Sequence, residues 1–193
     1  MAFAESIADP DESLVTRIAK GDEQAFTEIV RRHSGRLRVL ALRFCGDAGE
    51  ADEIIQDAFW SVWRRADRWQ PGGPPFAAWL TRITINRAID SDRRRRVRRF
   101  FGLEAADNVA DPTASAEAAT TMRAELAAVS ADIRDLPARQ RAAILLAADG
   151  EHSNKDIAVD LGISEGAAEQ LLVRARRTLR ARLTERERVE ERR

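Results

Sequence analysis

Apolar residues recur every three or four positions along most of the chain, and no stretch alternates apolar and polar residues as a strand would. This spacing predicts helices over residues 12–20, 23–45 and 51–65, the first two separated by Gly21-Asp22 and the last two by a glycine-containing stop. Residues 70–75 contain three prolines and two glycines, a composition that predicts a loop. The pattern as a whole predicts an all-α protein.

A fourth helical pattern begins at Phe76 and continues without a break into the arginine-rich run of residues 93–99. Assigning 100° of rotation to each residue gives this helix two apolar sides, so we expect it to be packed between neighbours. One side holds Phe76, Leu80 and Ile83, and the other holds Ala78, Ile85 and Ile89. A third side is left to face a ligand, and it carries Trp79, Arg82, Asn86 and Arg93.

The chemistry of this third side matches single-stranded nucleic acid. An aromatic ring or a guanidinium group stacks on an exposed base, and an amide bonds to the base edge. The six arginines of residues 93–99 are suited to neutralising a phosphate backbone. The alternative is that Trp79 belongs to the core, that Asn86 lies on an ordinary helix surface, and that the arginines form a solvated helix end.

The C-terminal part shows a different motif. A helix follows Leu136-Pro137, and Ser153 with Asp156 resembles a capping box that starts a helix of about eight residues. Gly162 ends that helix, and Ser164 is expected to cap a second one that reaches roughly Leu183. Two helices joined by a short glycine turn predict a helix-turn-helix, although an ordinary helical hairpin has the same outline.

The outer face of the second helix is the face expected to meet the DNA major groove, with its N-terminal residues nearest the base edges. The inner face is apolar: Ala168, Leu171, Leu172, Ala175 and Leu179. The candidate DNA contacts are Ser164 at the cap, Gly166, Glu169, Gln170, Val173 and Arg177 on the outer face, and Arg174 at its margin.

Composition fits one or two small domains: the chain has 193 residues, 33% of them charged, and a net charge of zero. Residues 101–122 hold four acidic residues, no basic one and no apolar period, which predicts a flexible acidic linker between two domains. The absence of a long apolar run or a signal-peptide layout predicts a cytoplasmic protein without membrane insertion. Cys45 is alone, and the sequence offers no catalytic or cofactor motif, so we expect neither enzyme activity nor a cofactor.

Two segments together resemble a known family. They are DAFWSVWRRADRWQPGGPPFAAWLTRITINRAIDSDRRRR and LPARQRAAILLAADGEHSNKDIAVDLGISEGAAEQLLVRARRTL. The pair is similar to bacterial sigma factors of the extracytoplasmic function (ECF) group within the sigma-70 family. The resemblance implies a helical region 2 domain over residues 12–100, the linker over 101–122, a helix-turn-helix region 4 domain over 123–183, and a charged tail over 184–193.

By this resemblance, region 2 binds the β′ clamp helices of core RNA polymerase and melts the −10 promoter element. Gln56 matches the position that contacts the clamp, and its acidic neighbours Asp52, Glu53 and Asp57 suit a basic partner. Asn86 matches the pocket for a flipped promoter base. The −10 contacts implied are Trp79, Arg82, Asn86, Arg87, Arg93 and Arg94.

Region 4, again by resemblance, reads the −35 element and sits on the β-flap of polymerase. This chain has Gly166-Ala167-Ala168-Glu169-Gln170 where relatives commonly have Gly-Thr-Val followed by a basic residue and Ser, so Glu169 leaves the −35 affinity and sequence open. The resemblance also implies an anti-sigma factor as a partner. Two alternatives remain at this point: a stand-alone helix-turn-helix regulator, and a sigma mimic that sequesters an anti-sigma factor.

Overall fold

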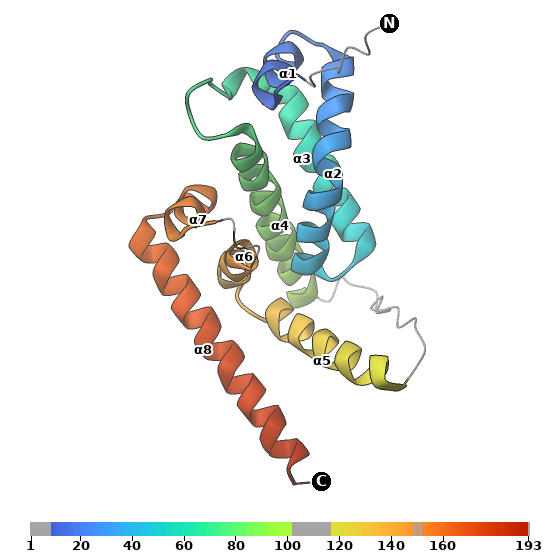
Figure 1. The fold of residues 1–193 in the computed structure, drawn as a ribbon, viewed down its shortest axis with the longest axis vertical. Coiled ribbons are helices and arrows are strands. Elements are labelled where there is room, and N and C mark those ends of the chain that lie inside the picture. Colours follow the sequence, from blue (N-terminus) through green and yellow to red (C-terminus); the bar gives the residue numbers. More distant parts are fainter. Residues whose placement is uncertain (1–8, 102–116, 149, 151, 193) are drawn as a thin grey trace, which may run out of the picture.

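The computed structural model describes residues 9–101, 117–148, 150 and 152–192 (Figure 1). Within these residues the fold is all-α, as predicted, and contains no strand. The elements are α1 (Asp11–Ile18), α2 (Glu23–Cys45), α3 (Ala48–Arg65), the 3-10 turn η1 (Ala66–Arg68), α4 (Phe76–Phe100), α5 (Glu117–Arg134), α6 (Ala138–Ala147), α7 (Asn154–Leu161) and α8 (Glu165–Glu190).

The first four helices form a bundle in which α2, α3 and α4 pack along one another and α1 closes one end. The Asp22 carboxylate caps α2 by accepting from the backbone N–H of Ala25 at 3.0 Å, which explains the predicted break before this helix. Phe26 of α2 packs edge-on against Phe59 and Trp63 of α3. The apolar positions read from the periodicity therefore face the bundle interior.

Helices α5 to α8 form the C-terminal part, and α8 runs well beyond the body of the molecule (Figure 1). The predicted capping box is present, because Ser153 and Asp156 bond reciprocally at the start of α7. Gly162 ends α7 with φ +61°, a left-handed conformation that favours glycine, and Ser164 caps α8. The helix-turn-helix is thus formed by α7, the turn and the first part of α8.

The two parts are not separate bodies in this structure. Helices α6 and α7 lie against α4, and α5 and α6 contact α2, so that apolar side chains of both parts share one core. At this junction a Cβ added to Gly46, at the end of α2, would overlap Cδ of Arg134 at the end of α5. The N-terminal bundle and the helix-turn-helix part therefore pack tightly together.

Two element boundaries differ from the sequence-based prediction by more than three residues, and α5 was not predicted as a helix. Helix α5 begins at Glu117, so residues 117–122 of the predicted linker lie in a helix; six of the 18 residues of α5 are alanine, which favours helix without any apolar period. The rest of the predicted linker, residues 102–116, lies outside the described residues. Helix α8 continues to Glu190 instead of ending near Leu183, because no helix breaker follows and Arg182 and Arg186 pair with Asp132 of α5. None of the described helices is sufficiently long and apolar to cross a membrane.

Candidate nucleic-acid interface

The predicted third side of α4 lies at the surface. Arg82, Asn86 and Arg93 are exposed, and Trp79 is half-buried with its ring tilted against Phe76 at a centroid distance of 5.8 Å. Trp79 thus combines packing with a partly open ring, which reconciles the two interpretations of this residue. We call Trp79, Arg82, Asn86 and Arg93 the α4 strip.

The arginine-rich end of α4 is partly neutralised by the chain itself. Arg95 donates to Glu50 at 3.0 Å, and both Arg95 and Arg96 bond to the buried carboxylate of Asp92. These two guanidinium groups therefore have anionic partners within the fold. Arg93, Arg94, Arg98 and Arg99 are exposed, and Arg93 lies 3.8 Å from Asp90 in an exposed ion pair with which an anionic ligand can compete.

Arg87 does not lie with the α4 strip, although the resemblance groups it with Asn86. Its Nη2 donates to the Ser61 hydroxyl of α3 at 2.7 Å. One residue step rotates a helix position by about 100°, which carries Arg87 away from the side that holds Asn86. Arg87 lines a cavity of ≈ 170 Å³ between α3 and α4, which is also lined by Arg94, Ser91, Ile54, Glu53, Gln56 and Asp57.

The four candidate polymerase contacts share an exposed face of α3: Asp52, Glu53, Gln56 and Asp57. Asp52 also bonds to Arg38 of α2 at 2.6 Å, and this hydrogen bond holds the pKa of the Asp52 carboxyl below its usual value. The Asp52 carboxylate is therefore held ionised and is braced from α2.

An apolar groove of ≈ 750 Å³ runs beside this face between α2 and α3, lined in part by Phe26, Val30 and Phe59. Trp60 is 57% exposed at its edge and was not among the predicted site residues. The sequence carried a signal for it, because Trp60 follows Gln56 by four residues and so lies one turn further along the same face. An exposed tryptophan beside a groove is typical of an interaction surface.

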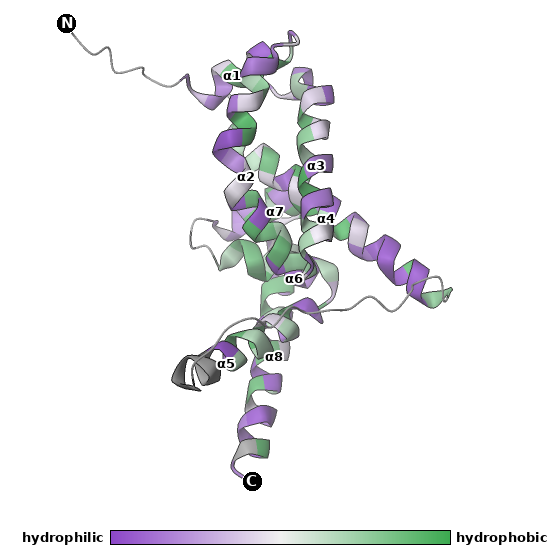
Figure 2. Cartoon of the chain, turned by 90° about the vertical axis from the view of Figure 1, so that its right-hand side faces the viewer, coloured by the Kyte–Doolittle hydropathy of each residue, from purple (hydrophilic) through white to green (hydrophobic). Residues whose placement is uncertain are grey.

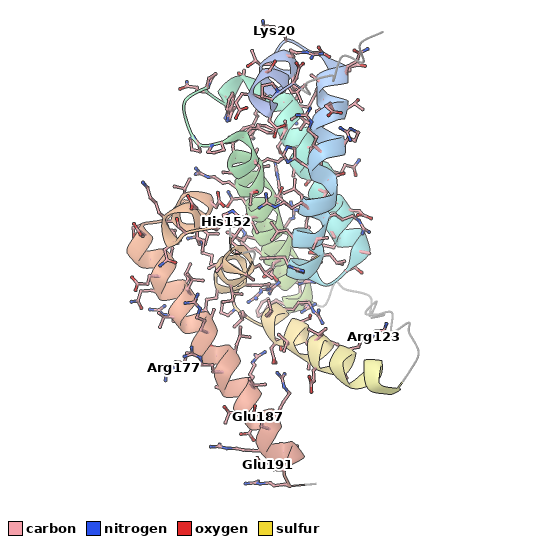
Figure 3. All side chains as sticks on the ribbon, viewed as in Figure 1. Lys20, Arg123, His152, Arg177, Glu187 and Glu191 are labelled. Carbon is pink, nitrogen blue, oxygen red and sulfur yellow. The ribbon has the colours of Figure 1, made fainter. Side chains whose placement is uncertain are left out.

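The predicted outer face of α8 is also exposed. Ser164 accepts from the backbone N–H of Ala167 at 3.3 Å, so its hydroxyl caps the helix. Arg177 points away from the rest of the molecule (Figure 3). The remaining candidates, Gly166, Glu169, Gln170, Val173 and Arg174, are all exposed.

The α4 strip and the helix-turn-helix meet at one point. A Cβ placed on Gly162, in the turn before α8, would lie 3.5 Å from Nη2 of Arg82. The structure therefore brings the two candidate nucleic-acid surfaces, which are about 80 residues apart in sequence, next to each other.

Comparison with known proteins identifies the family of this chain. Residues 29–99 match the family model of sigma-70 region 2, and residues 128–179 match that of sigma-70 region 4. The RNA polymerase sigma factor CnrH of Cupriavidus metallidurans is 36% identical over 182 residues, which cover 91% of this chain and 95% of the relative. The chain belongs to the ECF group of the sigma-70 family. It is thus an alternative sigma factor acting in transcription initiation, and sigma factors are initiation factors and not catalytic enzymes.

Further relatives agree with this assignment. The ECF RNA polymerase sigma factor SigM of Mycobacterium tuberculosis is 34% identical over 169 residues, covering 88% of this chain and 82% of the relative. The structure of CnrH in complex with the cytosolic domain of CnrY is similar with a TM-score of 0.64 at 32% identity, covering 91% of this chain and 98% of the other. The sigma factor RpoE of Bartonella quintana, solved with the anti-sigma factor NepR, shares the fold with a TM-score of 0.64 at 24% identity, covering 82% of this chain and 96% of the other.

Proposed function

We propose that this sigma factor binds core RNA polymerase through the acidic face of α3, melts the −10 element against the α4 strip, and reads the −35 element with α8. The observation that supports this best is the presence, in one chain, of an exposed aromatic-polar strip and an exposed helix-turn-helix outer face. The first chemistry suits unpaired bases and the second suits duplex DNA. The protein would act in the cytoplasm, where polymerase and the chromosome are found.

The polymerase surface combines two kinds of contact. Asp52, Glu53 and Asp57 provide negative charge that speeds and orients docking on the basic β′ clamp helices. Gln56 lies between this charged face and the apolar groove, since it lines both neighbouring cavities. Trp60 would then bury its ring against the partner, and region 4 would sit on the β-flap.

Promoter reading requires the two parts to separate. Elements named −10 and −35 lie about 25 base pairs apart, or about 85 Å along B-DNA. Arg82 lies beside the turn before α8 here, since a Cβ placed on Gly162 would be 3.5 Å from its Nη2. In this packed arrangement the protein therefore cannot contact the −10 and −35 elements of one promoter at the same time. Binding to polymerase would separate the two parts.

An anti-sigma factor is the second proposed partner, and it would stabilise this packed arrangement. Its support is the likeness to CnrH, solved with the cytosolic domain of CnrY, and to RpoE, solved with the anti-sigma factor NepR. Such a partner has two surfaces available in the packed state, namely the apolar groove between α2 and α3 and the exposed face of α3.

Run-off transcription with core polymerase tests the function. Adding the purified protein to core enzyme should give transcripts from candidate promoters that are absent without it. A Trp60→Ala variant should lose core binding, whereas Val39→Ala, which shortens another exposed apolar residue on α2, should keep it. Duplex binding without polymerase association would instead identify a stand-alone regulator. Binding to an anti-sigma factor without any transcription would identify a sigma mimic.

A further inference from the structure

The C-terminal end of α4 carries two large aromatic side chains in solvent. Phe100 is 84% exposed and Phe101 is 66% exposed. Figure 2 shows this end of the helix as a hydrophilic segment that projects from the body and ends in a hydrophobic tip. Phenylalanine is usually buried, and an exposed aromatic pair next to polar residues marks a binding surface.

Phe100 lies on the same side of the helix as the α4 strip. On a count of 100° per residue, Arg82, Asn86, Arg93 and Phe100 fall within about 40° of one another. All four are exposed. The strip that begins with an aromatic ring at Trp79 therefore also ends with one.

The geometry of the pair holds Phe100 in place. The rings of Phe100 and Phe101 stand at 88° with a centroid distance of 5.4 Å, an edge-to-face contact that restrains both side chains. Restraining a ring before binding lowers the conformational cost of stacking another ring on it. The pair is thus a preformed stacking surface.

The charge around the pair identifies the kind of ligand. Residues 93–101 contain six arginines and no acidic residue, and Arg93 and Arg94 are exposed on the helix that leads to Phe100. Exposed aromatic rings among arginines match a single nucleic-acid strand, since its bases have open faces and its backbone is anionic. A duplex hides those faces within its base stack.

We propose that Phe100, braced by Phe101, stacks on an unpaired base of the strand that the α4 strip holds. This rests on the proposed function in taking the melted promoter as the source of that strand. The distance from Asn86 to Phe100 is 14 residues of helix, about 21 Å at 1.5 Å per residue, or about six nucleotides of a stacked strand. The site extends the contact with melted DNA well beyond the −10 base pocket.

Direct binding of the full chain to a labelled 16-nucleotide single strand of mixed sequence, followed by fluorescence anisotropy, tests the site without polymerase. Phe100→Leu should weaken binding about 5-fold or more, the lower end of what one base–aromatic stack contributes. Phe100→Tyr should bind within about twofold of the unchanged protein, because tyrosine keeps the aromatic ring. Val39→Ala, at a residue 49% exposed on α2, is the apolar control away from the α4 strip and should leave binding unchanged.

The salt dependence separates stacking from charge. Phe100→Leu should leave the slope of log affinity against log salt unchanged, whereas Arg93→Gln should reduce it by about one. Phe100→Leu and the unchanged protein should bind the annealed duplex with equal affinity.

Three results would overturn the proposal. The first is no binding of the single strand, and the second is equal binding by the unchanged protein and Phe100→Leu. The third is an equal loss of affinity with Phe100→Tyr and Phe100→Leu, because it would indicate that Phe100 makes an apolar contact with protein. Run-off transcription could fail while the variants still bind the single strand in the expected order. That result would overturn the proposed function but would support this site.

Discussion

Asp92 of α4 and Arg141 of α6 form a buried ion pair across the two halves of the protein, with 3.1 Å between Oδ1 and Nη2. Asp92 is 3% exposed and Arg141 is 1% exposed. Arg141 also donates to the backbone carbonyls of Phe44 at 2.9 Å and Leu136 at 3.1 Å, and its guanidinium lies over the Phe44 ring. Burial lowers the pKa of Arg141 from its usual value, and Asp92 opposes this shift.

Replacing Asp92 and replacing Arg141 should lower the unfolding free energy by different amounts. Asp92→Asn leaves Arg141 buried without a counter-charge, beside Arg95 and Arg96, and should cost about 3–5 kcal/mol of unfolding free energy. Arg141→Met leaves Asp92 paired with Arg95 and Arg96. Its main effect is that two buried backbone carbonyls lose their donor, which should cost about 1–3 kcal/mol of unfolding free energy. Urea unfolding followed by tryptophan fluorescence measures both. A greater loss with Arg141→Met would contradict this account.

Gly46 should be more sensitive to alanine than Gly21. Both have positive φ, +79° and +87°, so alanine at either costs about 1–2 kcal/mol of backbone strain. A Cβ on Gly21 meets nothing within 4 Å, whereas one on Gly46 overlaps Arg134. The overlapped atoms belong to the flexible side chain of Arg134, so Gly46→Ala should lose only about 1 kcal/mol more in thermal unfolding, the cost of moving Arg134 to another rotamer, and Arg134→Ala should recover that difference in the double variant. Equal losses at Gly21 and Gly46 would mean that Arg134 moves aside without cost.

Periodicity and capping were sufficient to predict the helices other than α5, since both are local. Ser153 with Asp156, for example, sets the start of α7 through contacts three residues apart. The Asp92 to Arg141 pair spans 49 residues, and no local rule selects Arg141 from 32 basic residues as the buried one. The packing of the two parts could not be predicted for the same reason.

The candidate site was predictable where helix rotation alone decides which residues share a face. Arg82, Asn86 and Arg93 are exposed as expected, and the expected outer face of α8 is exposed. Arg87 was grouped with Asn86 by resemblance, and the structure turns it towards Ser61. Trp60 and Phe100 are not predicted as site residues from the sequence, because large apolar residues ordinarily belong to the core.

Asn86→Ala should impair promoter melting while leaving polymerase binding intact. Asn86 is exposed, so its loss leaves the core of the bundle unchanged. Removing an amide contact to a base edge costs about 1–3 kcal/mol, or about 5- to 150-fold in open-complex formation. Permanganate reactivity of promoter thymines measures melting, and native gels measure assembly with core enzyme. Equal loss in both assays would mean that Asn86 serves the fold.

Glu169→Arg should strengthen binding of the full chain to duplex DNA and change the preferred sequence. Glu169 is exposed on the outer face of α8, where a carboxylate repels phosphate and accepts from cytosine. Arginine there can pair with guanine or phosphate, which should raise affinity by about 1–3 kcal/mol and steepen the salt dependence by about one.

Glu187→Arg is the matched control for this change. It makes the same change of charge near the other end of α8, about 27 Å away along the helix axis, and is also exposed (Figure 3). Gel shifts at fixed salt with a randomised duplex pool report both affinity and preferred sequence. Selected sequences should change with Glu169→Arg alone. If neither affinity nor sequence moves, or if both variants act alike, Glu169 does not lie at the major groove and the −35 element is read by other residues.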